Sequence, residues 1–531
     1  MPTSDAPAEP TNSLFSNNPQ PPTPDMAGIK ALAKETAIYG VSSILGRFLN
    51  WCLVPLYVYI FPTEEYGIVS YLYSLTAVAL VVLNYGMETG FFRFAAKPGA
   101  DPERIYSTTL ISTACSSALF IFLLLVLLGP ASRLLLLPHH PEYVALLGIT
   151  VAIDAFCNIP FANLRRRKRA VRFAAIKLIN VFSNIALNLF FILACPAIWR
   201  HCPGAIGWFY APLGGEAFGI GWIFVANLIS TLIVLGCLLP DVVRVRFAFD
   251  AAAWRRMLAY SWPLLVLGVA GIMSQNMGQI VIPYLFESQE EAARSMVGIY
   301  GANIKIAIVM VMFTQAFRYA YEPFIFARAG AADKQQAYCD AMKFFVVFGL
   351  LIFLGVMFFL PVLKHFVAPA YWPGLDVVPI MMAAELCFGI FFNLSLWYKL
   401  TDRTQWGMWF SLIGFALMLG LNVWFVPAIG IPRGYVGSAW AALISYAAIM
   451  LLSYFVGRKY YPLPYQIGRM ALYTVGAAAL YAAGIGLTSE ATPAWLLYSF
   501  RTALLLIYAA AVLRFERVPL PGPLGRLTNR S

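Results

Sequence analysis

The chain of 531 residues is 60% hydrophobic and only 12% charged, and its mean hydropathy is +0.73. Soluble domains carry about 25% charged residues, so most of this chain cannot face water. Apolar runs of about 20 residues, long enough to cross a bilayer, recur from end to end. The sequence therefore predicts an all-α integral membrane protein.

Hydropathy and helix-breaking residues predict 14 transmembrane helices. In chain order we expect them near residues 36–60, 66–94, 105–129, 142–164, 173–195, 215–239, 255–283, 296–325, 341–362, 372–400, 405–426, 434–457, 467–487 and 493–514.

The predicted helices divide the chain into an N-lobe of helices 1–6, a C-lobe of helices 7–12 and two further helices. Residues 1–25 contain no Lys or Arg and are rich in Pro, Ser, Thr and Asn, which is typical of a disordered tail and not of a secretory signal. The expected boundaries are a cytoplasmic tail at 1–30, the N-lobe at 31–240, the C-lobe at 241–457, helices 13–14 at 458–514 and a tail at 515–531.

The positive charges are distributed unevenly between the predicted loops. With the N-terminus inside, 29 of the 37 Lys and Arg fall on cytoplasmic segments and helix ends, five fall in outer loops, and three fall inside spans. The densest run is Arg165–Arg169 with Arg172, between helices 4 and 5. This one-sided excess follows the positive-inside rule, so both termini are expected in the cytoplasm and the run is chiefly a topology anchor.

Two pairs of segments repeat in the same order along the chain. Residues 54–74 are similar to 282–305, and residues 186–192 ("ALNLFFI") are similar to 420–426 ("GLNVWFV"). The first pair shares a proline before an acidic loop and a glycine at the start of the next span (Pro55 and Gly67; Pro283 and Gly298). Helices 1–6 and 7–12 are therefore predicted to be two copies of one unit around a central cavity, a common plan for transporters.

Two cations lie deep within the predicted spans, Arg47 in helix 1 and Lys305 in helix 8. Intramembrane charge is costly and usually faces a cavity, and these two residues belong to opposite halves of the repeat. They are the predicted substrate-binding cations, suited to an anionic group such as a pyrophosphate.

Further polar residues within the spans are candidates for the cavity or for gating. In helix 2, Asn84 and Glu88 are four residues apart, so they are expected on one face of the helix. The amides could equally be interhelical hydrogen bonds of about 1 kcal/mol or less, and the residues near the inner interface could snorkel or form local ion pairs. The full set is Ser43, Asn50, Asn84, Glu88, Arg93, Asp154, Gln275, Asn276, Gln315, Arg318 and Glu322.

Other chemistry is sparse. The four histidines fall in outer loops without the spacing of metal ligands, and no phosphate-binding loop is present. Cys195 and Cys202 flank an outer loop and could pair in an oxidising periplasm or stay free. No catalytic residue and no metal site is predicted.

Four stretches resemble the polysaccharide-transport branch of the MOP exporter superfamily, the flippases of lipid-linked oligosaccharides. They are "EEYGIVS" (64–70), "YGMETGFFRFA" (85–95), "PFANLRRRKRAVRF" (160–173) and "LNVWFVPAIGIPRGYVGSAWAALISY" (421–446). The resemblance implies two six-helix lobes around a cationic cavity with inward-open and outward-open states. Relatives often carry an acidic–basic pair in helix 7, where this chain has Gly278 and Gln279.

The function implied is translocation of a polyprenyl-pyrophosphate-linked oligosaccharide from the cytoplasmic to the periplasmic leaflet of the bacterial inner membrane. The alternatives are a lipid II flippase, a multidrug or cation antiporter of the same superfamily and, less favoured, a membrane glycan polymerase or ligase. The implied partners are that glycan and membrane lipids, with other glycan-assembly proteins left open and no nucleic acid. No cofactor is expected, and a proton gradient, a Na⁺ gradient or the membrane potential remain alternative energy sources.

Overall fold

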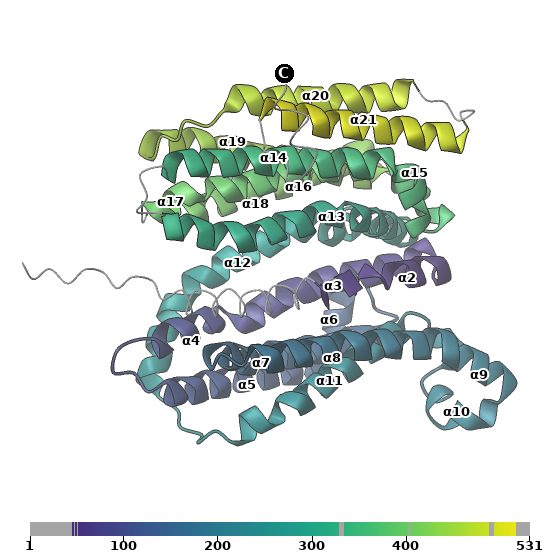
Figure 1. Ribbon diagram of the computed structural model, residues 1–531. Coiled ribbons are helices and arrows are strands. Elements are labelled where there is room, and N and C mark those ends of the chain that lie inside the picture. Colours follow the sequence, from purple (N-terminus) through teal and green to yellow (C-terminus); the bar gives the residue numbers. More distant parts are fainter. Residues whose placement is uncertain are drawn as a thin grey trace, which may run out of the picture.

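The computed structural model describes residues 45, 46, 48, 49, 51–328, 334–401, 403, 405–487 and 493–516, with only the backbone at 320 and 322–328. Every regular element in these residues is helical, in agreement with the predicted all-α class. The long helices lie side by side in layers, roughly along one direction (Figure 1).

The first group of helices, which we call the N-lobe, packs around α7. Its contacts join α7 to α3, α5 and α11, and α11 to α8. Its elements are α2 (Val54–Ile60), α3 (Thr63–Asn84), α4 (Met87–Ala95), α5 (Pro102–Val126), α6 (Leu128–Leu134), α7 (Pro141–Arg166), α8 (Ala170–Leu189), α9 (Cys195–His201), α10 (Pro203–Tyr210) and α11 (Gly221–Val243).

The second group, the C-lobe, packs around α16 and α19, and a C-terminal helical hairpin covers its α14. The C-lobe consists of α12 (Ala251–Leu285), α13 (Glu290–Arg328), α14 (Lys334–Phe358), α15 (Leu360–Leu363), α16 (Val377–Leu394), α17 (Leu396–Leu400), α18 (Gln405–Ile429) and α19 (Gly434–Tyr460). The hairpin consists of α20 (Ile467–Gly486) and α21 (Ala494–Phe515). It lies on the outer side of the C-lobe, away from the N-lobe (Figure 1).

Twelve helices of the described chain are long and apolar enough to cross a membrane. This number does not confirm the expected 14. The first expected helix ends as α2, and its residues 36–44, 47 and 50 lie outside the described residues. The thirteenth is present as α20, but its composition does not place it among the twelve.

The second expected helix is broken in two. Tyr85 and Gly86 adopt left-handed backbone conformations, with φ of 32° and 72°. A Cβ atom on Gly86 would lie 3.0 Å from the carbonyl oxygen of Ser261 in α12, so glycine permits both the turn and the close approach. Asn84 is therefore the last residue of α3 and Glu88 lies in the first turn of α4, and the prediction of one continuous polar face is wrong.

The segment expected to be an outer loop near 196–214 is partly helical. The chain leaves α8 through a π-helical turn and continues as α9 and α10. These two helices project beyond the rest of the N-lobe (Figure 1). Arg200 of α9 pairs with Glu216 at 2.9 Å, and Cys195 and Cys202 are free thiols.

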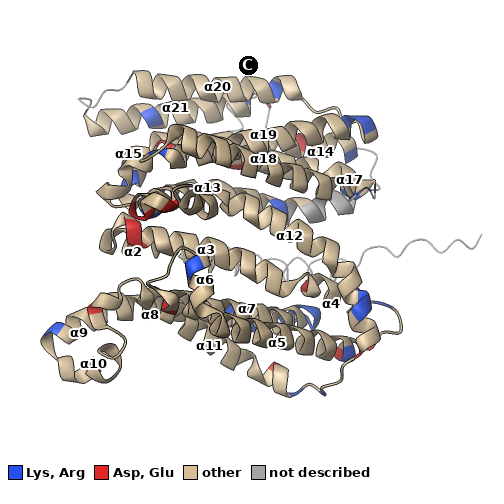
Figure 2. Cartoon of the chain, turned by 180° about the vertical axis from the view of Figure 1, so that it is seen from behind, with Lys and Arg blue, Asp and Glu red and all other residues tan. Residues whose placement is uncertain are grey.

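Basic residues gather at the end of the molecule that carries α4 and α17, which we call the basic end (Figure 2). The run between α7 and α8 pairs there with carboxylates of three other N-lobe elements. Arg165 pairs with Glu88, Arg166 and Arg167 with Glu103, and Arg172 with Asp241. The run thus joins α4, α5 and α11 to the turn between α7 and α8, although each partly exposed pair contributes only about 0–1 kcal/mol.

The linker between the lobes is attached to α5 at the same end. The backbone N–H of Ala248 donates to Ser107 at 2.8 Å, and that of Asp250 donates to Thr108 at 3.1 Å. Asp250 also caps α12 by accepting from the N–H of Ala253 at 2.9 Å. That backbone hydrogen bond, with the charge of Arg104, holds the pKa of Asp250 below its usual value.

Candidate functional site

The lobes meet where α3 crosses α13, at the end opposite the basic end, and glycines allow the contact. A Cβ atom on Gly67 would lie 1.9 Å from the carbonyl oxygen of Arg294, and one on Gly298 would lie 2.0 Å from that of Thr63. These glycines are the equivalent positions of the sequence repeat. The two copies of the unit therefore pack against each other through equivalent residues.

We expect Gly298→Ala to lower the free energy of unfolding by about 1–3 kcal/mol, the usual cost of overpacking. The added methyl group would collide with the backbone of α3, which cannot rotate aside. Gly355→Ala in α14 is the matched control, because a Cβ atom there meets open space. Thermal unfolding of the two variants in detergent tests this expectation, and equal midpoints would contradict it.

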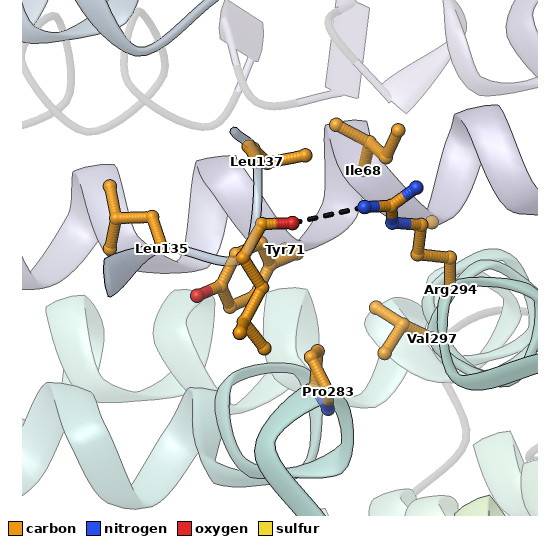
Figure 3. Close-up of a pocket in the computed structure, with 9 residues that line it drawn as sticks. Ile68, Tyr71, Leu135, Leu137, Pro283, Arg294 and Val297 are labelled. Carbon is orange, nitrogen blue, oxygen red and sulfur yellow. Dashed lines mark hydrogen bonds between the residues drawn. The ribbon is translucent and has the colours of Figure 1, made fainter. Parts of the chain in front are cut away.

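Polar contacts close the same end of the junction, which we call the sealed end. The hydroxyls of Thr63 and Ser295 are 2.8 Å apart, and the hydroxyl of Tyr71 donates to that of Tyr284 at 2.9 Å. Arg294 of α13 donates to the carbonyl oxygen of Leu136, which follows α6, at 3.0 Å (Figure 3). The N-lobe and C-lobe are thus hydrogen-bonded to each other at this end.

The helices of the junction become more exposed toward the basic end. In α3, Val69 is 1% exposed whereas Val82 is 47% exposed. In α13, Val297 is fully buried whereas Tyr319 is 49% exposed. The contact between α3 and α13 is therefore tightest at the sealed end. At the basic end the lobes meet through α4 and α12 instead, where Met87, Phe91 and Met257 are fully buried.

Lys305 lies on α13 between the buried and the exposed part of that helix, and its side chain is half-buried. The indole N–H of Trp51 donates to the Lys305 carbonyl oxygen at 2.7 Å, which places the chain just before α2 beside this turn of α13. Within the described part of the chain, no carboxylate forms an ion pair with the Lys305 ammonium. A half-buried lysine of this kind can bind an anion.

The other predicted cation, Arg47, lies outside the described residues, as do Ser43 and Asn50. The Glu322 side chain lies outside them too.

Three of the predicted polar residues belong to the interior or the basic end of the N-lobe. Asn84 accepts a hydrogen bond from Asn158 of α7 at 3.2 Å, and Asp154 accepts one from Thr231 of α11 at 3.2 Å. Glu88 pairs with Arg165. All three thus have partners within the N-lobe, as expected for side chains that hold helices together.

The remaining predicted residues lie on the helices of the junction. On α12, Gln275 is exposed, and Asn276 donates to the carbonyl oxygen of Ile272 in its own helix at 2.9 Å. Arg93 stacks over Tyr260 with its guanidinium 4.1 Å from the ring centre. Gln315 is half-buried on α13, and Arg318 stacks at 4.3 Å over Phe392.

Two residues of interest are absent from the predicted set. Gln279 of α12 is 5% exposed and accepts a hydrogen bond from Ser74 of α3, so it joins the two lobes. Glu385 is the single charged residue of α16. The available signal for Glu385 was a single acidic residue in an apolar span. No sequence pattern indicates that Gln279 faces the other lobe.

Two lobes built from helices of membrane length, which pack against each other through α3, α4, α12 and α13, define a multi-pass membrane protein. The family model described as "Polysaccharide biosynthesis protein" matches residues 32–326, more than half of the chain. The chain therefore belongs to this family, the polysaccharide branch of the MOP exporter superfamily, and is a flippase-type transporter. A search of curated proteins finds no match.

Solved structures share the fold at low sequence identity. The lipid II flippase MurJ, in an inward closed conformation, is 12% identical with a TM-score of 0.62, and the match covers 93% of this chain and 100% of MurJ. An inward-facing multidrug resistance transporter of the MATE family is 14% identical with a TM-score of 0.60, covering 81% and 97%. A MOP superfamily transporter from Pyrococcus furiosus is 13% identical with a TM-score of 0.52, covering 80% and 95%.

Proposed function

We propose that the protein flips a polyprenyl-pyrophosphate-linked oligosaccharide, a precursor of O-antigen, capsule or exopolysaccharide, across the bacterial inner membrane by alternating access. The basic end faces the cytoplasm with both termini, and the sealed end faces the periplasm. The observation that carries this proposal is Lys305, a cation on the junction where the tightly packed part of α13 ends. Arg47 is proposed to be the second cation of the site.

The physical task agrees with this arrangement. A pyrophosphate and a glycan cannot cross hydrocarbon unaided, because burying their charges and hydroxyls without partners costs several kcal/mol per group. A polar path with a cation replaces part of the lost hydration, while the polyprenyl tail stays in the bilayer. Because the sealed end is closed in this structure, the substrate would enter from the basic end.

Neighbouring functions remain distinguishable by experiment. MurJ is named as a lipid II flippase and the MATE neighbours as multidrug transporters, and both share this fold. An organic cation would be repelled by Lys305, which favours an anionic substrate. A polymerase or ligase would need outer catalytic residues, and Arg200, one candidate in that region, is paired with Glu216.

The decisive experiment is a proteoliposome assay with the full chain and defined lipid substrates. Transfer between leaflets is scored for a polyprenyl-pyrophosphate-linked oligosaccharide and for lipid II, with uptake of an organic cation as the third arm. We expect transfer of the oligosaccharide lipid. Transfer of lipid II alone, or uptake of the organic cation alone, would overturn the proposal in favour of that function.

A disulfide across the sealed end is expected to stop transport. Thr63 and Ser295 face each other with 2.8 Å between their hydroxyls, so cysteines at both positions lie within disulfide range. The pair is introduced after replacing the exposed native cysteines Cys52, Cys115 and Cys202.

Oxidation is expected to abolish flipping by the double variant and reduction to restore it, since the lobes must separate there for release. The single variants Thr63→Cys and Ser295→Cys are the controls. Undiminished flipping by the cross-linked protein would show that this end does not open during transport.

A further inference from the structure

The C-lobe contains a carboxylate that the proposed substrate site does not use. Glu385 lies near the middle of α16, between two contacts with tyrosines. The hydroxyl of Tyr300 in α13 donates to the sulfur of Met381 at 3.6 Å, and the ring centre of Tyr446 in α19 lies 4.8 Å from that of Phe388. Glu385 forms no hydrogen bond or ion pair with any residue that the structure describes. A carboxylate at this depth is costly to keep charged, so it is a functional candidate.

A line of polar groups leads from Glu385 toward the basic end. Gly389 and Asn393 follow at intervals of four, so they share one face of α16 with Glu385. Thr314 of α13 lies against Gly389, since a Cβ atom there would be 2.9 Å from the Thr314 hydroxyl oxygen. We call Glu385, Thr314 and Asn393 the α16 polar line.

The groups of this line are available for hydrogen bonding. The Thr314 hydroxyl and both polar atoms of the Asn393 side chain are buried without a partner among the described residues, and Asn393 is 1% exposed. Buried polar groups are nearly always hydrogen-bonded in native proteins, so unpaired ones need an explanation. Gly389, which Thr314 contacts, and Asn393 lie four and eight residues beyond Glu385 on α16, on the side of the basic end.

The sequence repeat supports a special role for Glu385. Residues 154–161 ("DAFCNIPF") align with 385–392 ("ELCFGIFF"), so Asp154 of α7 and Glu385 are equivalent positions. Each is followed seven residues later by a phenylalanine under a cation: Lys177 lies 4.2 Å from the ring centre of Phe161, and Arg318 lies 4.3 Å from that of Phe392.

The surroundings of the two acids differ. Asp154 accepts a hydrogen bond from Thr231, and its charge interacts with that of Lys177 in α8. The turns of α16 on either side of Glu385 pack against Tyr300 and Tyr446, and the side of α14 that meets Gly389 presents Phe345. A charge that has a cationic neighbour is stabilised in its ionised form, whereas one without is free to take up a proton.

We propose that Glu385 is the proton-binding site that couples an inward proton gradient to outward transport. The carboxylate takes up one proton from water on the sealed side when that side is open, and becomes a neutral acid. It releases the same proton along the α16 polar line to water at the basic end. This inference rests on the proposed transport function, and it assigns the energy source to a proton.

A spectroscopic test separates this inference from the proposed function, because it needs no glycan. Infrared difference spectra of the full chain in liposomes are recorded as the pH is lowered. We expect a carboxylic acid C=O band that is lost in Glu385→Gln and kept in Glu287→Gln, an exposed glutamate near the sealed end. Persistence of the whole band in Glu385→Gln would overturn the assignment. Glu385→Asp is the second variant, and it is expected to keep a shifted band.

Transport driven by a pH gradient provides the second readout. In the proteoliposome assay, Glu385→Gln is expected to lower the gradient-driven rate at least about tenfold, a change that corresponds to about 1.4 kcal/mol. Asn393→Leu should slow that rate while keeping the infrared band, because it interrupts the path and leaves the acceptor. An unchanged response to the pH gradient in Glu385→Gln, or driving by Na⁺ instead of protons, would overturn the inference.

Discussion

Replacing Lys305 with methionine is expected to lower the rate of glycan flipping by about 10- to 150-fold. A hydrogen bond to a charged group contributes about 1.5–3 kcal/mol, which corresponds to that range. Methionine keeps the length of the side chain and removes the charge, so packing on α13 is retained. The measurement is leaflet transfer of a polyprenyl-pyrophosphate-linked oligosaccharide in proteoliposomes.

Three comparisons show whether the charge of Lys305 is responsible. Lys305→Arg is expected to keep most of the rate, and Lys364→Met, a lysine stacked over Trp372 at 4.3 Å, is expected to have no effect. Arg47→Ala should abolish export with the protein still folded. Wild-type rates in Lys305→Met would remove Lys305 from the substrate site.

The second large effect concerns the attachment of the C-terminal hairpin. Lys343 of α14 and Glu516, directly after α21, form an ion pair in which each side chain is 4% exposed. Glu516 also accepts from the Tyr473 hydroxyl at 2.6 Å and lies 3.6 Å from Arg469. This cluster joins α14, α20 and α21.

Glu516→Leu is expected to lower the free energy of unfolding by about 3 kcal/mol, the lower end of the range for breaking a buried ion pair. The loss of unfolding free energy stays at this lower end because Lys343 keeps a second acidic partner, Asp340, at 3.2 Å. The double variant Lys343→Met with Glu516→Leu should recover most of the loss, since no buried charge is then left unpaired. Denaturant unfolding in detergent measures both, and equal losses in the single and double variants would contradict this account.

The cluster also predicts the pH dependence of stability. Burial raises the pKa of Glu516, but the hydrogen bonds from Lys343 and Tyr473 and the charges of Lys343 and Arg469 outweigh it, so the pKa is lowered from 4.5. A lowered pKa in the folded state means that the contribution is present above the unfolded value and is lost as the pH falls below 4.5. The free energy of unfolding of the Glu516→Leu variant should therefore fall less than that of the wild type as the pH drops below 4.5.

Composition and charge were enough to predict the class of protein and most of its helices. Apolar runs of membrane length must become helices, because a bilayer offers no water to backbone groups. The repeat also identified Gly67 and Gly298, which the structure shows at the contact between the lobes. These features depend on local composition or on similarity within the chain, so the sequence contains them.

The tertiary structure decided which polar side chains meet. Asn84 and Glu88 appeared to share a helical face, but the turn at Tyr85–Gly86 separates them, because α12 approaches closely at that point. The basic run reads as a topology anchor, and the structure adds its pairing with Glu88, Glu103 and Asp241. Partners more than 60 residues apart in sequence are brought together only by packing, so no spacing rule could identify them.

The same reason explains why Glu385 and Gln279 were not predicted. A single acid or amide in an apolar span indicates that a polar group is buried, but not what it faces. The structure shows that Gln279 joins α12 to α3 and that Glu385 lies on the part of α16 that packs against Tyr300 and Tyr446. The sequence alone determined that these groups lie in membrane-spanning segments. Which side chains surround them depends on how the helices pack, and those surroundings decide whether a charge is stabilised.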